Sequence, residues 1–228
     1  MSLRPLSVLE ARALGVLVEK ALTVPDSYPL SINALTLGCN QKTARDPVIA
    51  ATDGEVQVAV DGLKGLSLAF ESSGSRVSRY EHNMGRALGL PSQSVALLAA
   101  LMLRGPQTAS ELRMNSERLH RFADLSSVEG FLEELATRAV EKGGPLALKM
   151  PRLPGAREAR WVHLLSGMPE MGAGASASGA SGASADAAFL PVTELAALKA
   201  DHAALRAELG DLRALVDRLY AELGVDRA

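Results

Sequence analysis

Few side chains in this sequence have the types and spacing that catalysis or metal binding requires. The single cysteine, Cys39, has no histidine and carboxylate placed to form a recognisable nucleophilic group with it. The four histidines, His82, His120, His163 and His202, lack the spacing typical of metal ligands. We therefore expect a protein that is not an enzyme and needs no metal or other cofactor, in which Cys39 is a small buried core residue.

A basic motif that occurs twice is the most prominent candidate for binding. Residues 76–82 read RVSRYEH and residues 157–163 read REARWVH, so both contain Arg-x-x-Arg-aromatic-x-His. On a strand, Arg79 and Arg160 would point away from the aromatic ring and the histidine that follow them. In one interpretation the rings and histidines pack on helices, and each arginine pairs with acidic groups of the preceding helix. In the other, Arg79 and Arg160 contact phosphates or an acidic partner.

Further basic residues lie in polar segments outside this motif. The run 40–47 (NQKTARDP) contains Lys42 and Arg45, which suit nucleic-acid or protein contacts, unless the run is a solvated loop that caps neighbouring helices. The candidate residues for binding nucleic acid or a partner are Lys42, Arg45, Arg76, Arg79, Arg113, Arg118, Arg121, Lys149, Arg152, Arg157 and Arg160.

The elements that must position these residues also occur twice along the chain. Apolar positions at helical spacing predict a first helix around residues 6–18 and again around 90–102, at a constant offset of 84. A second helix is expected near Ser31 and near Thr108, at an offset of 77, and a third around 56–63 and 128–135, at an offset of 72. The chain therefore contains an internal duplication.

Capping residues and turn residues support the same order of elements. A hydroxyl three residues before a carboxylate, as in a capping box, predicts four helix starts. The pairs are Ser7 with Glu10, Thr52 with Glu55, Thr108 with Glu111, and Ser126 with Glu129. Short alternating runs broken by turn residues then predict β-hairpins within 68–82 and 146–165. Three helices and a hairpin predict an α+β, mostly helical fold with two tandem winged helix-turn-helix domains, 1–85 and 86–167.

The remainder of the chain differs in composition from the two repeats. Residues 168–190 are nearly all Gly, Ala and Ser, which predicts a disordered, flexible linker. Residues 191–226 carry a heptad pattern that predicts a coiled-coil helix, with acidic residues mostly at g and basic residues mostly at e. That charge pattern favours a parallel homodimer; the alternative is a single amphipathic helix that folds back on the winged helices. The dimerisation residues would be Leu195, Leu198, His202, Leu205, Leu209, Leu212, Val216, Leu219 and Leu223.

Composition excludes several other classes of protein. The chain has 228 residues, 47% of them hydrophobic and 4% aromatic, which suits two small cores of Leu, Val and Ala. Its longest apolar run, residues 95–103, is far shorter than the ~20 residues that a membrane-spanning helix needs. The N-terminal residues lack the apolar segment of a signal peptide, and one cysteine forms no internal disulfide. We expect a cytoplasmic protein that does not enter a membrane.

Four segments resemble the YceH-like family of bacterial proteins, whose domain is catalogued as of unknown function. They are LSVLEARALGVLVEK, YPLSINALTLGCNQKTARDPV, LRGPQTASELR and GAREARWVHLLSG. The resemblance covers roughly residues 3–168. It implies a pair of winged-helix domains in a cytoplasmic bacterial protein, and it implies no particular activity.

The distribution of charge leaves two functions open. Residues 1–85 hold eight Lys and Arg against nine Asp and Glu, and residues 86–167 hold eleven against eight, so neither half is strongly basic. Winged helices usually lay the third helix in the DNA major groove, but here both third helices carry mainly acidic residues. Any DNA contact should therefore be made by the hairpins and by the basic loop after the second helix of the second domain. We expect a DNA-binding, regulator-like homodimer, or else a protein-interaction or scaffold module that binds no DNA.

Overall fold

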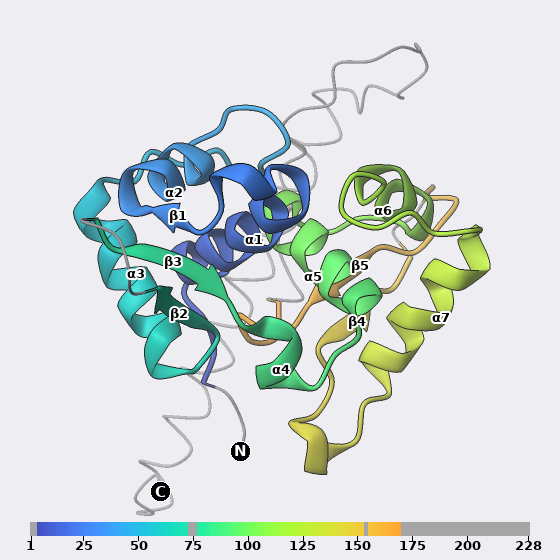
Figure 1. The fold of residues 1–228 in the computed structure, drawn as a ribbon. Coiled ribbons are helices and arrows are strands. Elements are labelled where there is room, and N and C mark those ends of the chain that lie inside the picture. The colour runs from blue at the N-terminus through green and yellow to red at the C-terminus, as the bar shows by residue number, and fades with distance from the viewer. Residues whose placement is uncertain (1–3, 73–76, 153–154, 170–228) are drawn as a thin grey trace, which may run out of the picture. The chain divides into compact units, whose positions relative to one another are not determined.

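The same order of elements, a helix, a short strand or bridge, two more helices and a β-hairpin, occurs twice along the chain (Figure 1). The computed structural model describes residues 4–72, 77–152 and 155–169, all of which lie in one compact unit. The predicted heptad segment and almost all of the predicted linker lie outside the described residues. The fold of the described part is mixed α+β, with short antiparallel sheets.

The first repeat has three α-helices and a three-stranded sheet. Its elements are α1 (Val8–Thr23), a 3-10 turn η1 (Pro25–Ser27), β1 (Leu30–Ser31), α2 (Ile32–Cys39), α3 (Asp53–Gly65), β2 (Ala69–Ser72) and β3 (Arg79–His82). The strands are antiparallel in the order β1-β3-β2. All three helices and the hairpin lie where periodicity predicts them, whereas the two-residue strand β1 was not predicted.

The second repeat follows the same order after a short connecting helix, α4 (Met84–Leu88), which contains the predicted domain boundary. Its elements are α5 (Ser92–Arg104), α6 (Ala109–Asn115), α7 (Leu125–Ala136), a 3-10 turn η2 (Val140–Lys142), β4 (Ala147–Lys149) and β5 (Trp161–His163). A single bridge between Gln107 and Trp161 takes the place that the β1–β3 pair of Leu30 and Tyr80 has in the first repeat. The duplication predicted from the sequence therefore extends to individual strand pairs.

Three of the four predicted capping boxes are present. Ser7, Thr52 and Thr108 each accept a hydrogen bond from the backbone of the glutamate three residues later, and that glutamate bonds back to the cap residue. The fourth prediction, a cap at Ser126, is wrong. Helix α7 begins at Leu125 because the Asp124 carboxylate accepts a bond from the backbone N–H of Ser127 at 2.7 Å. A stronger acceptor two residues earlier fixes the start of the helix.

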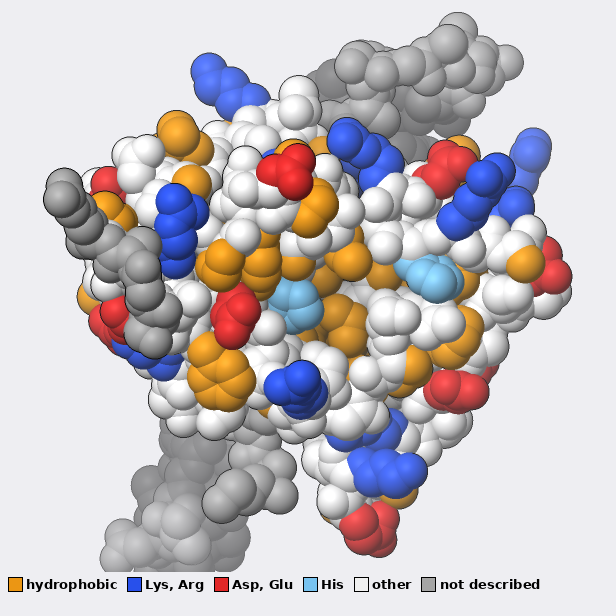
Figure 2. Space-filling view, in the orientation of Figure 1, with side chains coloured by type: hydrophobic (Ala, Val, Ile, Leu, Met, Phe, Trp, Pro, Cys, Tyr) orange, Lys and Arg blue, Asp and Glu red, His pale blue; other side chains and the backbone are white. Residues whose placement is uncertain are grey.

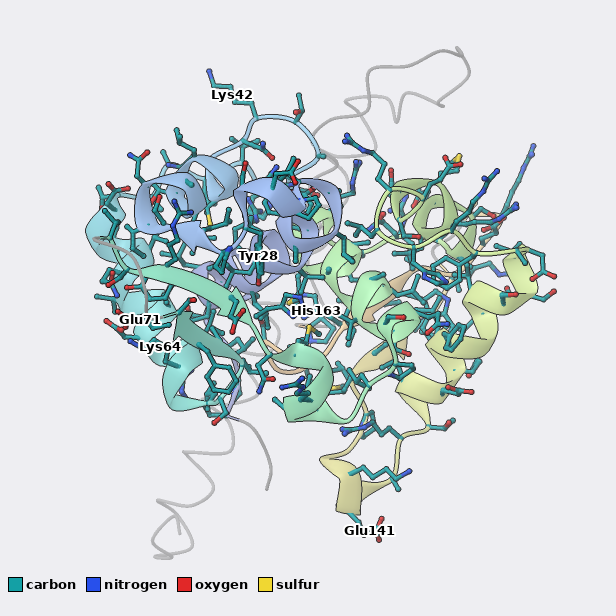
Figure 3. The ribbon with its side chains drawn as sticks, in the orientation of Figure 1. Tyr28, Lys42, Lys64, Glu71, Glu141 and His163 are labelled. Carbon is teal, nitrogen blue, oxygen red and sulfur yellow. The ribbon has the colours of Figure 1, made fainter. Side chains whose placement is uncertain are left out.

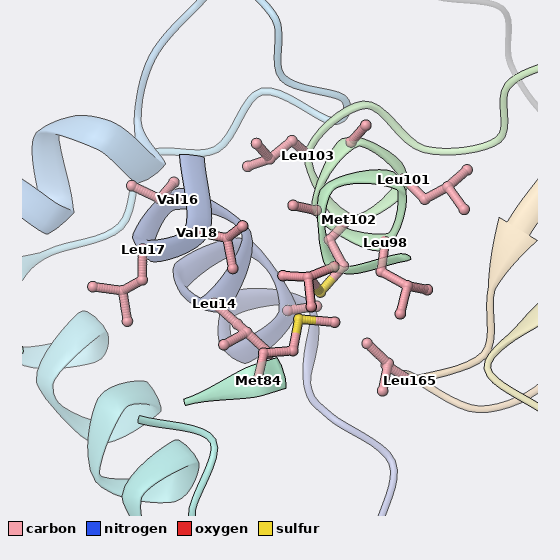
Figure 4. Close-up of a cluster of buried hydrophobic side chains, with 14 of the residues drawn as sticks. Leu14, Val16, Leu17, Val18, Met84, Leu98, Leu101, Met102, Leu103 and Leu165 are labelled. Carbon is pink, nitrogen blue, oxygen red and sulfur yellow. The ribbon is translucent and has the colours of Figure 1, made fainter. Parts of the chain in front are cut away.

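The first helices of the two repeats, α1 and α5, pack against each other at the centre of the described unit (Figures 1 and 4). Both are buried on nearly every side, α1 from Glu10 to Val18 and α5 from Ser94 to Leu103. Gly15 lets the helices approach closely, since a Cβ there would lie 3.0 Å from the Leu103 side chain. Helices that are apolar all round belong in an interior. The buried apolar side chains of both repeats consequently form one continuous core.

The two repeats also meet through main-chain hydrogen bonds. The amide of Leu6 donates to the carbonyl of Leu165 at 2.8 Å, and the amide of Asp46 donates to that of Leu103 at 2.8 Å. Each bond joins one repeat to the other, so polar as well as apolar contacts hold them together. Within the described ranges, no helix has both the length and the apolar character needed to cross a membrane.

Candidate partner-binding surface

The repeated Arg-x-x-Arg-aromatic-x-His motif has the same geometry in both hairpins. The rings of Tyr80 and Trp161 are buried. The Arg79 guanidinium donates to the carbonyl of Pro29 at 2.8 Å, and the Arg160 guanidinium donates to that of Pro106 at 2.7 Å. The two proline positions differ by 77, the offset of the second helices, and each lies two residues before a helix cap. In both repeats the arginine therefore fastens the hairpin to the start of the second helix.

This geometry agrees with the packing interpretation of the motif but corrects the predicted partner of each arginine. We expected the arginines to pair with acidic groups of the third helices. Instead both bind proline carbonyls, and Arg160 also pairs with Glu111 of α6 at 3.3 Å. The partners lie at the second helix because that element begins beside the hairpin, as the β1–β3 pair and the Gln107–Trp161 bridge require. Arg76 lies outside the described residues.

The histidines of the motif are half-buried in both hairpins. The Nδ1 atoms of His82 and His163 are buried and, within the described residues, have no hydrogen-bond partner. Burial lowers the pKa of both imidazoles, that of His163 to about 4. The backbone N–H of His82 donates to the Tyr28 hydroxyl at 2.6 Å, which ties this end of β3 to the segment before β1 (Figure 3). Within the described residues, neither histidine belongs to a group of three His, Cys, Asp or Glu side chains that could hold a metal ion.

Arg45, one of the predicted binding residues, is buried and cannot contact a partner, so that prediction is wrong. Its guanidinium donates to both carboxylate oxygens of Glu19, at 2.5 and 3.1 Å, to the Gln41 side chain at 2.6 Å and to the Gly38 carbonyl at 3.1 Å. A guanidinium with this many partners is a structural link between α1 and the loop after α2. The positive charge of Arg45 is therefore paired with Glu19 inside the fold.

In the rest of the 40–47 run, one residue stabilises the loop and another is available to a partner. The Asn40 side chain donates to the Ala51 carbonyl at 2.7 Å and accepts from the Ala51 amide at 2.8 Å, so it holds the loop closed. Lys42 is exposed and points away from the described unit (Figure 3). Of the basic pair predicted here, only Lys42 is available to a partner.

Three predicted residues of the second repeat, Arg113, Arg118 and Arg121, are exposed on α6 and the loop that follows it. Arg113 donates to the Ala123 carbonyl at 3.2 Å. Arg113 and Arg121 border a shallow pocket of about 440 Å³, which is also lined by Ser110, Met114, Glu117, Phe122 and Leu125. We call Lys42, Arg113, Arg118 and Arg121 the basic edge. In Figure 2, Lys and Arg side chains lie along the upper edge of the molecule, where Figure 1 places the loop after α2 and α6.

The basic residues of the second hairpin are exposed as predicted, with weaker internal contacts. The Lys149 ammonium lies 5.2 Å from the centre of the Trp161 ring and 3.6 Å from a Glu133 carboxylate oxygen. Arg152 donates to the backbone carbonyl of Arg157 at 3.3 Å. These residues form a second, more dispersed group of cations on the outside of the hairpin.

The third helices present acidic rather than basic surfaces. On α3, Asp53, Glu55 and Asp61 are exposed, and the one basic residue, Lys64, lies 2.7 Å from Glu71 and 3.4 Å from Asp61. On α7 the exposed charged residues are Glu129, Glu133 and Glu134. The helices that would normally enter a DNA groove thus carry the charge that DNA repels.

The one cysteine of the sequence lies in the core of the described part of the chain. Cys39 is fully buried, as predicted, and burial raises the pKa of its thiol to about 12. Residues 4–72, 77–152 and 155–169 contain no group of three His, Cys, Asp or Glu side chains arranged to hold a metal ion.

Sequence reasoning did not select Lys20 or Arg104, which line a second cleft of about 280 Å³ together with Arg118. The internal duplication of the sequence could have pointed to both residues. At the offset of 84, Lys20 at the end of α1 corresponds to Arg104 at the end of α5.

Comparison with known proteins identifies relatives along nearly the whole chain. A family model described as "Protein of unknown function, DUF480" matches residues 6–156. A UPF0502 protein of Leptothrix cholodnii is 60% identical over 226 residues, which is 98% of this chain and 97% of that protein. UPF0502 proteins of Burkholderia pseudomallei and Burkholderia cenocepacia are 60% and 59% identical, each over 99% of this chain and 92% of their own length. The similarity therefore includes the segment beyond the described residues.

Proposed function

We propose that this chain, which belongs to the DUF480 family of bacterial UPF0502 proteins, is a tandem winged-helix protein that binds DNA as a homodimer through its basic edge. The winged-helix assignment is supported by the order α1-β1-α2-α3-β2-β3 with the sheet order β1-β3-β2 in the first repeat. The repetition of that order in α5, α6, α7, β4 and β5 supports a second winged helix.

The observation that carries the proposal is the supply of exposed cations on the basic edge. Among the described residues, the side chains of Lys42, Arg118 and Arg121 make no hydrogen bond or ion pair, and Arg113 contacts only one carbonyl. Among the described residues that line the pocket beside Arg113 and Arg121, the one acidic residue is Glu117, and the Asp124 carboxylate interacts electrostatically with Arg113. Uncommitted Lys and Arg side chains neutralise phosphates and release counterions, which supplies most non-specific DNA affinity.

The acidic third helices determine how DNA would be bound. With Asp53, Glu55 and Asp61 exposed on α3, the usual docking of the third helix in the major groove is unfavourable. Contacts from the loops after α2 and α6 would instead track the phosphate backbone, with the exposed cations of the second hairpin as a further contact. Such binding would be strong at low salt and modestly selective for sequence.

A dimer would double the number of these contacts. The heptad pattern of residues 191–226, outside the described residues, supports a parallel homodimer, and the relatives align over this segment as well. Two protomers related by a twofold axis would present two basic edges to a pseudo-palindromic site. A cytoplasmic location fits this function and stays a prediction from the sequence.

The proposal is tested by measuring the affinity for genomic DNA fragments over a salt series, for example by fluorescence anisotropy. The native chain should lose affinity steeply with salt, and the double variant Lys42→Ala, Arg121→Ala should bind more weakly with a slope lower by about two, roughly one per lost phosphate contact. The double variant Arg86→Ala, Lys142→Ala is a matched control, since both residues are exposed cations outside the basic edge. Glu141, the neighbour of Lys142 in sequence, lies far from Lys42 in Figure 3. No binding at about 50 mM salt, or an equal effect of the control, contradicts the proposal.

A second candidate function is supported by the exposed apolar residues of the first repeat. Leu37 on α2 is 66% exposed and Val58 on α3 is 72% exposed, on helices that pack against each other. Exposed apolar side chains on neighbouring helices, one of which also carries exposed Asp53, Glu55 and Asp61, suit a protein partner with a basic rim. If DNA binding fails, capture of partners by the native chain and their loss with Leu37→Asp and Val58→Lys would favour this protein-interaction function.

A further inference from the structure

A polar cleft between the two repeats is lined by more cationic than acidic side chains. It has a volume of about 280 Å³ and lies between the end of α1, the loop after α2, the end of α5 and the segment after α6. Its cationic side chains are Lys20, Arg104 and Arg118. Both repeats contribute the same two regions, so the cleft is a product of their packing.

The residues that line this cleft occupy equivalent positions in the two repeats. At the first-helix offset of 84, Lys20 corresponds to Arg104, and at the second-helix offset of 77, Gln41 corresponds to Arg118. Two residues of one repeat and their counterparts in the other thus line the same cleft. A cation or hydrogen-bond donor is present on each side.

The one acidic residue of the cleft is already neutralised. Glu19 binds the buried Arg45 through both carboxylate oxygens, and it lies 3.4 Å from the Lys20 ammonium. Within the described ranges, the side chains of Arg104 and Arg118 make no hydrogen bond or ion pair. Arg104 is half-buried, and burial together with the nearby charge of Arg45 lowers its pKa. The Glu19 carboxylate lies close enough to raise the pKa of Arg104 in part, but it is bound to Arg45 and Lys20, so Arg104 has no carboxylate of its own. A half-buried guanidinium in that position favours a bound anion.

The neutral groups of the cleft also favour an anion. Gln41 uses its side-chain oxygen to accept from Arg45, which leaves its NH₂ group as a donor. The Thr43 hydroxyl is a second donor at the rim, while buried Ala100 and Leu103 close the floor. Gln41 and Thr43 thus add two hydrogen-bond donors to the three cations for a compact anion.

We propose that this cleft binds a small phosphorylated molecule carrying two or more negative charges, held by Lys20, Arg104 and Arg118. Three cations and one neutralised carboxylate match a diphosphate or a phosphomonoester better than a singly charged acid. A cleft of this volume admits a phosphate group with its ester but not a nucleic-acid duplex. The site shares Arg118 with the basic edge but includes neither Lys42 nor Arg121, so the two proposals can be tested separately through those residues.

Calorimetry with inorganic pyrophosphate and the full chain tests the proposal, at an ionic strength held constant with chloride. The native protein should bind one pyrophosphate per chain, and Lys20→Gln with Arg104→Gln should weaken binding by about tenfold or more. Arg104→Lys, which keeps the charge, should retain more affinity than Arg104→Gln. The control Lys142→Gln should bind as the native chain does. A nucleoside diphosphate and a duplex oligonucleotide serve as separate ligands to identify the source of the phosphate.

Three outcomes overturn the proposal: no pyrophosphate binding by the native chain, equal binding by the double variant, or binding of the duplex alone. If the double variant fails to fold, the thermal midpoint of the native chain supplies the answer. Pyrophosphate should raise that midpoint above its value in chloride of equal ionic strength, because a ligand that binds only the folded state stabilises it. An equal midpoint in both salts contradicts the site. Loss of DNA binding in Lys42→Ala, Arg121→Ala with pyrophosphate binding intact would separate this site from the proposed DNA contact.

Discussion

At the scale of single residues, the sequence predicts charge well but not how that charge is used. Arg45, Arg79 and Arg160 were all candidate binding residues, yet Arg45 is buried on Glu19, while exposed Arg79 and Arg160 donate to proline carbonyls. Arg12, which no motif marks, is also buried and donates to the carbonyls of Cys39 and Pro47. An arginine finds its partners among groups far away in the sequence, so residue type alone does not separate structural from available cations.

The buried imidazole of His163 should make stability depend on pH. Because burial lowers its folded-state pKa to about 4 from 6.5, its contribution is fully present above pH 6.5 and is lost as pH falls toward 4. Between pH 7 and 5 the imidazole of His163 becomes protonated in the unfolded chain but stays neutral in the folded chain. The free energy of unfolding should therefore fall by about 2 kcal/mol over this range because of this residue. Urea unfolding of His163→Phe at both pH values should give a correspondingly smaller loss than the native chain.

The comparison of pH effects does not depend on whether the substitution itself destabilises the fold. His120→Phe, on a half-exposed residue of the loop after α6, is the control for replacing an imidazole by a phenyl ring elsewhere in the chain. If His163→Phe loses as much stability between pH 7 and 5 as the native chain does, the imidazole is not the group responsible.

At the scale of elements, helices with caps of their own could be predicted and the pairing of elements could not. The boxes at Ser7, Thr52 and Thr108 locate α1, α3 and α6 correctly, since a capping box is decided by residues within one turn. The start of α7 was misplaced because Asp124 competes with Ser126 for the same role. Strand β1 escaped prediction because two residues give no periodicity.

Two glycines, each within a helix but with different neighbours, test how the helices pack. In α2, a Cβ on Gly38 would lie 2.5 Å from the Cγ1 of buried Val16, whereas in α7 a Cβ on Gly130 would meet nothing within 4 Å. Gly38→Ala should therefore destabilise by about 1–3 kcal/mol through overpacking of α2 on α1. Gly130→Ala should stabilise by up to about 1 kcal/mol through helix propensity alone.

Urea denaturation of the two variants measures both free energies directly. The pair is informative because the substitution is the same and only the surroundings differ. If Gly38→Ala is as stable as the native chain, then α2 does not lie against Val16 as described.

At the scale of the whole molecule, the duplication was visible in the sequence but its consequence for the core was not. The prediction gave each repeat its own amphipathic first helix, whereas α1 and α5 are buried on nearly every side and share one core. An apolar stripe predicts one buried face and does not say what covers the opposite one. The same packing brings Lys20 and Arg104 to one cleft, so the candidate anion site could not be found before the repeats were placed together.

Assembly beyond the single chain depends on the heptads of residues 191–226, and we predict that they make the protein a dimer. Replacing two seam leucines, Leu205→Lys and Leu212→Lys, buries like charges at d positions and should convert the dimer to a monomer. The control places the same lysines on the outer face, with Ala207→Lys and Ala214→Lys, and should remain dimeric. Light scattering coupled to gel filtration gives the mass in each case. A native chain with the mass of a monomer, or a seam variant that stays dimeric, contradicts the coiled coil. If the dimer is also needed for DNA binding, the seam variant should bind fragments more weakly than the control at equal salt, because only one basic edge per complex remains.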